Sequence, residues 1–396
     1  MQITGIIAEY DPFHNGHAAH IAAARSAGAT HIVVTISGSF TQRGEPAALT
    51  KWARARMALA GGADLVLETP LPFAMAPAEN FALGGVATLH ALGCVDTLSF
   101  GSECGDIRAL TEIAHITADP ACQAHLKQAM HDGIPYAAAL QTAVAAVCGE
   151  ETASLLEQAN NTLGIEYIRA AARLDAPLRF HTIPRIGAAH NAPSPTADIA
   201  SASLLRQYLR EGRIDDAARY MPAACADILR EEIADGHAPA NPQKLEYALL
   251  ARLRTMTVDE MAALPYVSEG LENRLYSAVQ TADSYDALLT ALKTKRYPTA
   301  RLRRILWAAL CGIPSAMPYG TPPYIRVLAM NAHGKEILAA AQPTLPIVSQ
   351  HRHIDELSPA ATAVWDVERR GSDLHALALP RPLPCGTDLT TKLICK

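Results

Sequence analysis

The sequence contains no run of eighteen or more apolar residues, although 49% of its 396 residues are hydrophobic. A transmembrane helix needs about 20 such residues, so no membrane span is expected. None of the eight cysteines forms a Cys-x-x-Cys pair, so we expect single thiols or small buried side chains instead of a disulfide or zinc framework. The first residues lack the basic and apolar regions of a signal peptide, which predicts a cytoplasmic location.

The sequence also lacks an excess of positive charge. Its formal net charge is −5, which argues against a globally basic nucleic-acid-binding protein but leaves room for a local basic surface. A chain of this length is too long for one small core, so two domains are expected.

The most informative segment is Tyr10-Asp11-Pro12-Phe13-His14-Asn15-Gly16-His17, which follows an apolar run and precedes a helix-compatible stretch. Two histidines three residues apart lie on one face of a helix. The start of a helix offers free N–H groups and the positive end of its dipole to an anion, and Gly16 lets a phosphate approach the backbone. The segment therefore predicts nucleotidyl transfer, in which His14 and His17 stabilise charge on an α-phosphate as pyrophosphate leaves.

Two simpler interpretations of this segment remain. The histidines, extended by His20, are one set of candidate metal ligands, although no acidic or cysteine ligand lies at a typical spacing. The second interpretation is a turn with a purely structural role, since a short motif in isolation often does not carry the function that it suggests.

The first half of the chain alternates short β-like runs with amphipathic helical stretches, which predicts an α/β fold with a Rossmann-like parallel sheet. We expect this nucleotidyltransferase domain to span residues 1–212 and a mainly α-helical domain to span 213–396. Ligands of such sheets bind beyond the carboxyl ends of the strands. These strands are expected at residues 3–8, 31–36, 64–67, 97–100 and 178–183, and the intervening helices at 18–27, 50–60, 79–92, 107–118 and 136–147. A separate strand is expected late in the chain, at residues 324–329. Segments 10–17, 37–44 and 101–103, together with Glu68, should therefore meet at one edge.

A second polar segment ends in Ser201-Ala202-Ser203-Leu204-Leu205-Arg206. Ser201 is a reasonable helix cap. The functional alternative is a second phosphate clamp, made by Ser201, Ser203 and the helix start, with Arg206 one turn further on.

Six cations occur within residues 293–304, and a helix is expected from Thr299 with Leu302, Ile305 and Leu306 on its buried side. The arginines should then face away from the core. A solvated face is the usual explanation of such a run, but no acidic residue is interleaved here, so we predict contact with a nucleic-acid backbone. The candidate residues for this nucleic-acid contact are Lys293, Lys295, Arg296, Arg301, Arg303 and Arg304.

Several strings together resemble the tRNA(Met) cytidine acetate ligase family of HIGH-motif nucleotidyltransferases. The resemblance spans nearly the whole chain. The most specific of the matching segments is Ser37-Gly38-Ser39-Phe40-Thr41-Gln42-Arg43-Gly44-Glu45-Pro46-Ala47. The sequence departs from the family pattern in residues 187–191 and at Ala202 and Ser203. The other matching segments are residues 5–17, 62–68, 100–103, 160–167, 295–306 and 324–328.

The resemblance implies an enzyme that uses ATP to activate acetate as acetyl-adenylate and then acetylates N4 of the wobble cytidine of elongator tRNA(Met). We also expect Mg²⁺ to bridge the phosphates, because the pyrophosphate leaving group is highly charged. Arg43, Lys51 and Arg206 are candidates to hold acetate or pyrophosphate. The alternatives are a small-molecule adenylyl- or cytidylyltransferase and a non-catalytic tRNA-binding protein. The implied ATP site comprises Ile7, Ala8, Glu9, Tyr10, Asp11, Pro12, Phe13, His14, Asn15, Gly16, His17, His20, Gly101, Asn160, Asn161, Arg185 and Ile186.

Overall fold

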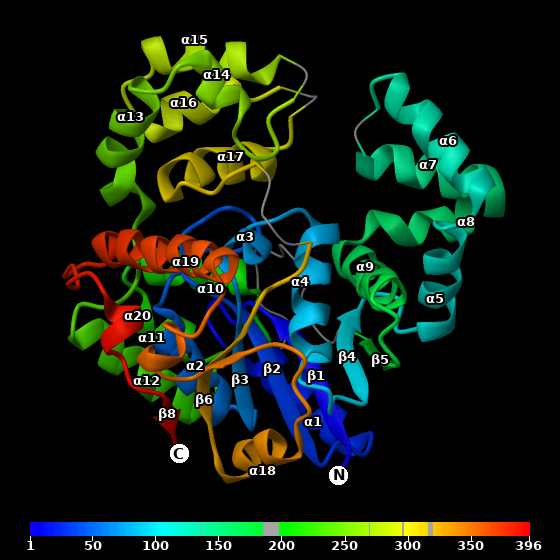
Figure 1. Ribbon diagram of the computed structural model, residues 1–396, viewed down its shortest axis with the longest axis vertical. Coiled ribbons are helices and arrows are strands. Elements are labelled where there is room, and N and C mark those ends of the chain that lie inside the picture. Colours follow the sequence, from blue (N-terminus) through cyan, green and yellow to red (C-terminus); the bar gives the residue numbers. More distant parts are fainter. Residues whose placement is uncertain (135, 185–197, 269, 295–296, 316–319) are drawn as a thin grey trace.

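The computed structural model describes residues 1–134, 136–184, 198–268, 270–294, 297–315 and 320–396. Its centre is an eight-stranded sheet in the order β5-β4-β1-β2-β3-β6-β7, with β8 beside β6 (Figure 1). The strands are β1 (Ile3–Ala8), β2 (His31–Ser37), β3 (Leu65–Thr69), β4 (Thr97–Ser102), β5 (Arg179–Pro184), β6 (Ile325–Met330), β7 (Ile347–Val348) and β8 (Ile394–Cys395). The expected α/β class with a parallel sheet is thus confirmed.

The order of the strands reverses at β1. Strand β1 pairs in parallel with β2 on one side and with β4 on the other, where Ile6 lies beside Ser99. In open α/β sheets ligands bind at such a reversal, beyond the carboxyl ends of the two strands. The segments that follow β1 and β4, residues 9–14 and 103–106, therefore flank the expected ligand crevice.

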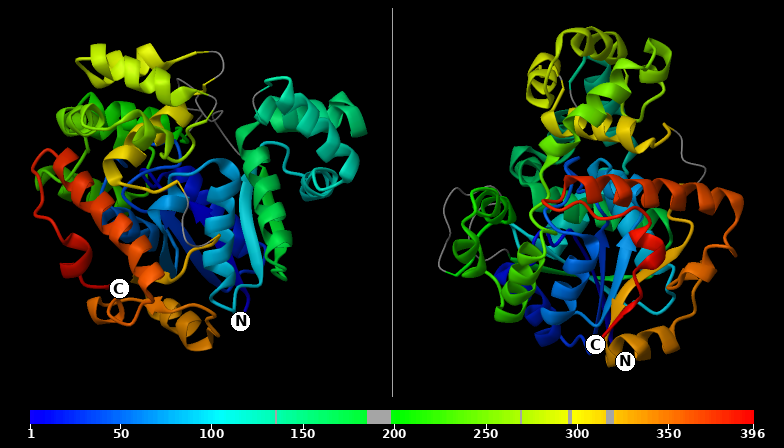
Figure 2. Two further views of the ribbon diagram at one scale, coloured as in Figure 1. Left: turned by 45° about the horizontal axis from the view of Figure 1, so that its top comes forward. Right: turned by 90° about the vertical axis from the view of Figure 1, so that its left-hand side faces the viewer.

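Helices cover both faces of the sheet (Figure 2). Neighbouring strand residues such as Ile6 and Ile7 enter different hydrophobic cores, which explains why the strands appear in the sequence as continuous apolar runs. One core contains α1 (Asn15–Ser26), α2 (Lys51–Ala60), α10 (Ala202–Arg210), α11 (Ile214–Ala218) and α12 (Ala223–Ala234). The opposite core contains α4 (Ala78–His90) and α9 (Ala159–Arg173).

Two helical lobes stand apart at the upper right and upper left of Figure 1. The first contains α5 (Ile107–Ile116), α6 (Pro120–His131), α7 (Tyr136–Cys148), α8 (Glu150–Ser154) and η1 (Leu155–Glu157). The second contains η2 (Pro242–Leu245), α13 (Glu246–Arg254), α14 (Val258–Ala262), α15 (Leu271–Thr281), α16 (Tyr285–Leu292) and α17 (Thr299–Cys311), in agreement with the helices expected after residue 212.

After the second lobe the chain returns to the sheet. Strand β6 pairs antiparallel with β3, and β7 and β8 pair with β6. The predicted domain boundary at residue 212 stays a prediction. It does not account for the return of β6, β7 and β8 to the sheet of the first domain. No helix of the described residues is long and apolar enough to cross a membrane. The remaining helices are α3 (Leu71–Ala74), α18 (Ala332–Ala340), η3 (His351–His353), α19 (Pro359–Ala378) and α20 (Thr387–Thr390).

A buried cluster of charges joins the returning segment to the sheet. The Nζ atom of Lys51 lies 2.7 Å from Oε1 of Glu68, 3.1 Å from Oε1 of Glu368 and 2.7 Å from Oδ1 of Asp388. The guanidinium of Arg326 lies 3.4 Å from the same Asp388 oxygen. These side chains come from α2, β3, α19, α20 and β6, so a single group of ion pairs connects all five elements.

The charges in this cluster balance only if one carboxyl group is protonated. Burial and the neighbouring Glu368 raise the pKa of Glu68 well above its usual range. Although burial opposes it, the attraction of Lys51 and Arg326 holds the pKa of Asp388 below its ordinary value. A protonated Glu68 leaves two carboxylates facing two cations, which is the arrangement that burial tolerates.

Replacing Lys51 with Met should destabilise the protein by about 3–5 kcal/mol, because it leaves buried carboxylates without their cation. The free energy of unfolding in urea measures this loss. Arg56→Met, on the same helix, is the matched control. Arg56 is 38% exposed and pairs with Glu231 and Glu232, so its loss should cost less than about 1 kcal/mol. Equal losses in the two variants would contradict a special role for the cluster.

Candidate functional site

Two stacked imidazoles form the start of α1, directly beyond β1. The Nδ1 atom of His14 accepts a hydrogen bond from the backbone N–H of Gly16 at 3.1 Å, and Nδ1 of His17 accepts one from the backbone N–H of His14 at 3.2 Å. The rings are 3.7 Å apart and 22° from parallel. Because each Nδ1 is an acceptor, each neutral ring carries its proton on Nε2, the form that donates a hydrogen bond to an anion.

The aromatic rings of Tyr10 and Phe13 pack against the ring of His17. Tyr10 has a positive φ of 50°, and its ring lies 4.7 Å from His17 and 4.7 Å from Phe13. Phe13 is fully buried and fits against Gly61, where any side chain would collide with its ring. The loop is therefore rigidly packed, and the histidines need little reorganisation to meet a substrate.

The buried guanidinium of Arg54 fixes the carboxyl ends of β1 and β2. Its Nη1 atom donates to the carbonyl of Glu9 at 2.8 Å and to that of Ser37 at 2.9 Å, and Nη2 donates to the carbonyl of Gly38. Our sequence analysis missed this residue. The signal was available, since Lys51 and Arg54 are cations three residues apart in a helix that is otherwise largely buried.

The loop of residues 37–44 lies beside the first motif. Oε1 of Glu9 accepts a hydrogen bond from the backbone N–H of Gln42 at 2.6 Å, and burial raises the pKa of Glu9 above its ordinary value. Arg43, a candidate anion ligand, lies in the same loop. The structure thus brings together two of the segments that the sequence predicted to meet.

Helix α17 holds this loop from the other side. Arg304 donates from Nη1 to the carbonyl of Gln42 at 3.1 Å, and Arg303 forms an ion pair with Glu45. The backbone of Arg304 also comes so close to Gly44 that a Cβ atom there would lie 2.6 Å from its nitrogen. The second lobe is therefore attached directly to the edge of the nucleotide crevice.

This attachment corrects one expectation. Arg303 and Arg304 do not face away from the protein, because an acidic partner distant in sequence, Glu45, and a loop carbonyl engage them. Arg301 donates from Nε to the carbonyl of Tyr266 at 3.0 Å and from Nη2 to Oγ of Ser268 at 2.7 Å. Lys293 is exposed, and Lys295 and Arg296 lie outside the described residues.

The second polar segment also reaches the first motif. Asn15 donates from Nδ2 to the carbonyl of Asp198 at 2.9 Å, and Arg206 donates from Nη1 to the carbonyl of Asp11 at 2.7 Å. Ser201 caps α10 by accepting from the backbone N–H of Leu204 at 3.2 Å, and its Oγ lies 3.0 Å from that of Ser203. The starts of α1 and α10 therefore lie on the same crevice.

Asn160 and Asn161, beside the end of β4, differ in burial and in their hydrogen bonds. Asn161 is fully buried: its Oδ1 accepts from the backbone N–H groups of Glu103 and Cys104 at 2.9 and 3.1 Å, and its Nδ2 donates to two further oxygens. Asn160 is half-buried and donates to Oε1 of Glu103 at 2.5 Å. Asn161 thus serves the fold, and Asn160 is the better placed of the two to meet a ligand beside Gly101.

The remaining candidates are more scattered. His20 lies one turn beyond His17, with its Nε2 3.0 Å from Oγ of Ser99. Lys51 lies in the buried charge cluster with a side chain that is 2% exposed, a placement that argues against its role as an anion ligand. Arg185 and Ile186 lie outside the described residues. Within those residues, no group of potential metal ligands includes the motif's histidines, so a metal site there gains no support.

The chain matches the model of the HIGH Nucleotidyl Transferase family over residues 1–383. It is 36% identical to the tRNA(Met) cytidine acetate ligase of Acetivibrio thermocellus, and the alignment covers 100% of both chains. It is 38% identical to the protein of the same name from Anoxybacillus flavithermus, over 97% of this chain and 96% of that one. These matches confirm the family resemblance read from the motifs.

Solved structures agree with the sequence relatives. The fold matches Thermotoga maritima TmcAL bound with alpha-thio ATP with a TM-score of 0.92 and 29% identity, covering 100% of both chains. The apo form of the same protein matches with a TM-score of 0.94 and 30% identity, again over both complete chains. The similarity therefore includes both helical lobes as well as the sheet.

The two asparagines should respond differently to substitution. Asn161→Ala should lower the free energy of unfolding by about 2 kcal/mol, because it leaves the backbone N–H groups of Glu103 and Cys104 without their acceptor and removes a buried side chain that makes four hydrogen bonds. Asn160→Ala should cost about 1 kcal/mol or less, since its side chain is partly exposed. Urea unfolding of both variants tests the assignment, and a loss in Asn160→Ala as large as in Asn161→Ala would overturn it.

Proposed function

The chain belongs to the HIGH nucleotidyl transferase family, and we propose that it is a cytoplasmic, ATP-dependent tRNA(Met) cytidine acetate ligase. It would activate acetate as acetyl-adenylate and transfer the acetyl group to N4 of the wobble cytidine of elongator tRNA(Met). The observation that carries this proposal is the stacked His14–His17 pair at the start of α1, placed where the strand order reverses. Full-length similarity to ligases of this name supports the substrates.

The first step joins acetate to the nucleotide. Acetate is already ionised at neutral pH, so its oxygen needs positioning and not deprotonation. That oxygen attacks the α-phosphorus of ATP, the bond from phosphorus to the bridging oxygen breaks, and pyrophosphate leaves with the bonding electrons. The Nε2–H groups of His14 and His17 donate to phosphate oxygens as their charge increases, and neither histidine acts as a base.

The site residues suggest how the anions are held. Arg206 donates through Nη1 to Asp11, and among the described residues no bond uses its Nη2, which we assign to the pyrophosphate or the carboxylate. Arg43 is the second candidate for these anions. Ser201 and Ser203, at the start of α10, and Asn160, beside the end of β4, would contact the phosphates and the nucleoside respectively.

The carboxylates near this site are already engaged by the protein. Glu9 and Asp11 accept backbone N–H groups from Gln42 and Ala48 at 2.6 and 2.7 Å. They do not form a cage for a resident metal ion, so we treat Mg²⁺ as part of the MgATP substrate, where it shields the charge of the phosphates.

The second step transfers the acetyl group to RNA. The cytidine amine attacks the acetyl carbonyl, the bond between that carbon and the phosphate oxygen breaks, AMP leaves, and the amine loses a proton. The base must leave its stack to reach the crevice, which is feasible in a single-stranded loop. Helix α17 contacts the loop at Gln42 and Glu45, which borders the crevice, so RNA bound to the second lobe would be close to the crevice.

Removing either imidazole should slow the first step by about 30- to 1,000-fold, equivalent to about 2–4 kcal/mol of transition-state stabilisation. His14→Ser retains a helix cap, and His17→Ala removes the second ring. The measurement is acetate-dependent pyrophosphate release from ATP. His115→Ala, which replaces an exposed histidine on α5, is the control and should keep the wild-type rate. Wild-type release by a folded double variant would refute the mechanism.

The same assay separates the alternative functions. It is run with acetate, propionate or no acid, with and without tRNA, and with labelled acetate. Acetate-dependent release followed by label on tRNA is the expected result. Release that depends instead on a phosphorylated small molecule would favour an adenylyl- or cytidylyltransferase. ATP binding with no release under any condition would favour a non-catalytic tRNA-binding protein.

The basic segment gives a separate prediction. Replacing Lys293, Lys295 and Arg296 together with Ala should weaken tRNA binding and flatten its dependence on salt, while sparing pyrophosphate release. Replacing Arg303 and Arg304 should also reduce pyrophosphate release, because these residues hold the loop at Gln42 and Glu45. Filter binding over a salt series and the release assay measure the two effects. Unchanged tRNA affinity of the triple variant at moderate salt would assign these cations to a solvated surface.

A further inference from the structure

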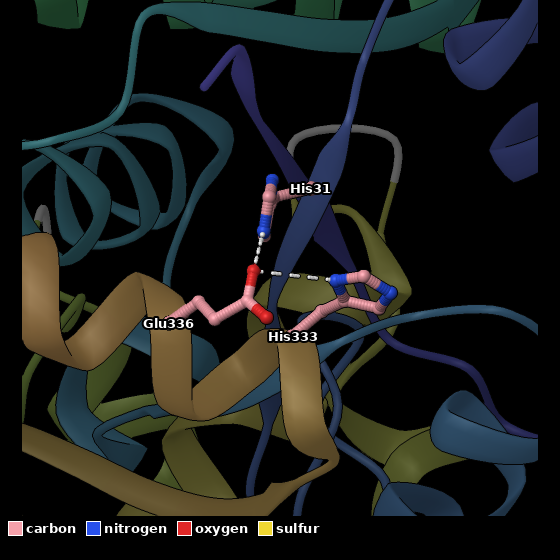
Figure 3. Close-up of side chains that lie close together, drawn as sticks. All are labelled: His31, His333 and Glu336. Atoms are coloured by element: carbon pink, nitrogen blue, oxygen red, sulfur yellow. Dashed lines mark hydrogen bonds and ion pairs between the residues drawn. The ribbon is translucent and has the colours of Figure 1, made fainter.

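Two histidines and a glutamate converge at the amino end of β2, whereas the nucleotide crevice lies beyond the carboxyl ends of the strands. Figure 3 shows the three side chains. His31 is the first residue of β2, and His333 and Glu336 lie three apart on α18. One donor atom from each of the three residues lies within 4.8 Å of the others. We propose that these residues bind a zinc ion, which links β2 to α18.

The distances suit this ion. Oε2 of Glu336 lies 3.0 Å from Nε2 of His31 and 3.5 Å from Nδ1 of His333. Ligands about 2.0–2.1 Å from a tetrahedral zinc are separated by about 3.3 Å, so both separations are close to this spacing. His333 and Glu336 are more than half exposed, so their side chains can rotate by the small amount that brings all three ligands onto the ion, and water can fill the fourth position.

The backbone beneath the ligands is firmly held. Asn331 caps α18 by accepting the backbone N–H of Gly334 at 2.9 Å, and its Nδ2 donates to Oδ1 of Asp64 at 3.0 Å. A Cβ atom at Gly334 would lie 2.3 Å from the carbonyl of Asp64, so only glycine allows the helix to approach this closely. Because Gly334 lies between the two ligands of α18, this approach places both of them beside His31.

A hydroxyl group supports the form of His31 that metal binding requires. Zinc at Nε2 leaves the ring proton on Nδ1, which needs an acceptor. Oγ1 of Thr30 lies 2.8 Å from Nδ1 of His31 and 3.1 Å from the carbonyl of Gln2. The hydroxyl can therefore accept from Nδ1 while it donates to Gln2. Without an ion it can donate to Nδ1 instead, and Nε2–H then bonds to Glu336.

The location assigns the ion a structural role. His31 pairs with Ile3 at the beginning of β1, whereas His14 follows the end of that strand, about 20 Å away along six residues of β-structure. The ion would not meet ATP. It would instead connect the first half of the chain to the segment that returns after the second lobe, and so stabilise the folded state.

Zinc affinity tests the proposal, measured on the complete, metal-stripped protein by competition with a chromophoric chelator. The expected result is one zinc per chain, an affinity at least tenfold lower in His333→Ala and in Glu336→Gln, and a weaker loss in Thr30→Val. Both ligand substitutions lie on the exposed side of α18, so the fold should persist. His131→Ala, which removes an 85% exposed histidine paired with Asp132, is the matched control and should bind as the wild type does.

Cobalt(II) distinguishes this site from adventitious binding to thiols. A site of two imidazoles and a carboxylate gives visible d–d absorption without the ultraviolet charge-transfer band of a cobalt–thiolate bond. The exposed Cys385 and Cys395 are replaced with Ser in a parallel sample, which should bind zinc unchanged. Equal affinities in wild type, His333→Ala and Glu336→Gln, or a thiolate band that disappears with these two serines, would show the three residues to be a plain ion pair.

Discussion

The nucleotide crevice depends on the burial of one guanidinium group. Arg54 has no carboxylate at bonding distance among the described residues, and its hydrogen bonds go to the backbone carbonyls of residues 9, 37, 38 and 49. A buried charge is tolerated when its donors are satisfied, and here three of the four acceptors, the carbonyls of residues 9, 37 and 38, lie at or just beyond the ends of parallel strands. One side chain thus sets the spacing between the first motif and the neighbouring loop.

The neighbouring loop, residues 37–44, connects the first motif to the second lobe. Glu9 holds Gln42, and Gln42 in turn accepts from Arg304 of α17. The second lobe, to which we propose that RNA binds, and the proposed site of adenylate chemistry are therefore joined through a few residues of backbone. This arrangement lets the position of the lobe influence the geometry of the loop without any long-range motion, because both are part of one packed unit.

The sequence predicted the elements with strong periodicity and failed where tertiary contacts decide. Strand β1 and the start of α17 were placed to the residue. Helix α19, the 20-residue Pro359–Ala378, was missed, because buried polar residues such as Glu368 and Ser372 interrupt its apolar side. The partners of Lys51, Arg54 and Arg303 are distant in sequence, so the local pattern can at most mark Lys51 and Arg54 as cations in a buried helix and does not reveal what they bind. The cluster of His31, His333 and Glu336 spans some 300 positions and was equally invisible.

The late return of the chain also constrains how the protein is made. The edge of β3 receives β6 only after residues 70–324 have been synthesised, which at about 5–20 residues per second takes roughly 13–50 s. During that time the apolar strand β3 has an unpaired edge. Lys51 also lacks two of its three carboxylate partners, Glu368 and Asp388. A nascent chain in this state is open to aggregation at that edge, so the ribosome-bound intermediate, and not the finished enzyme, is where chaperone binding should matter most.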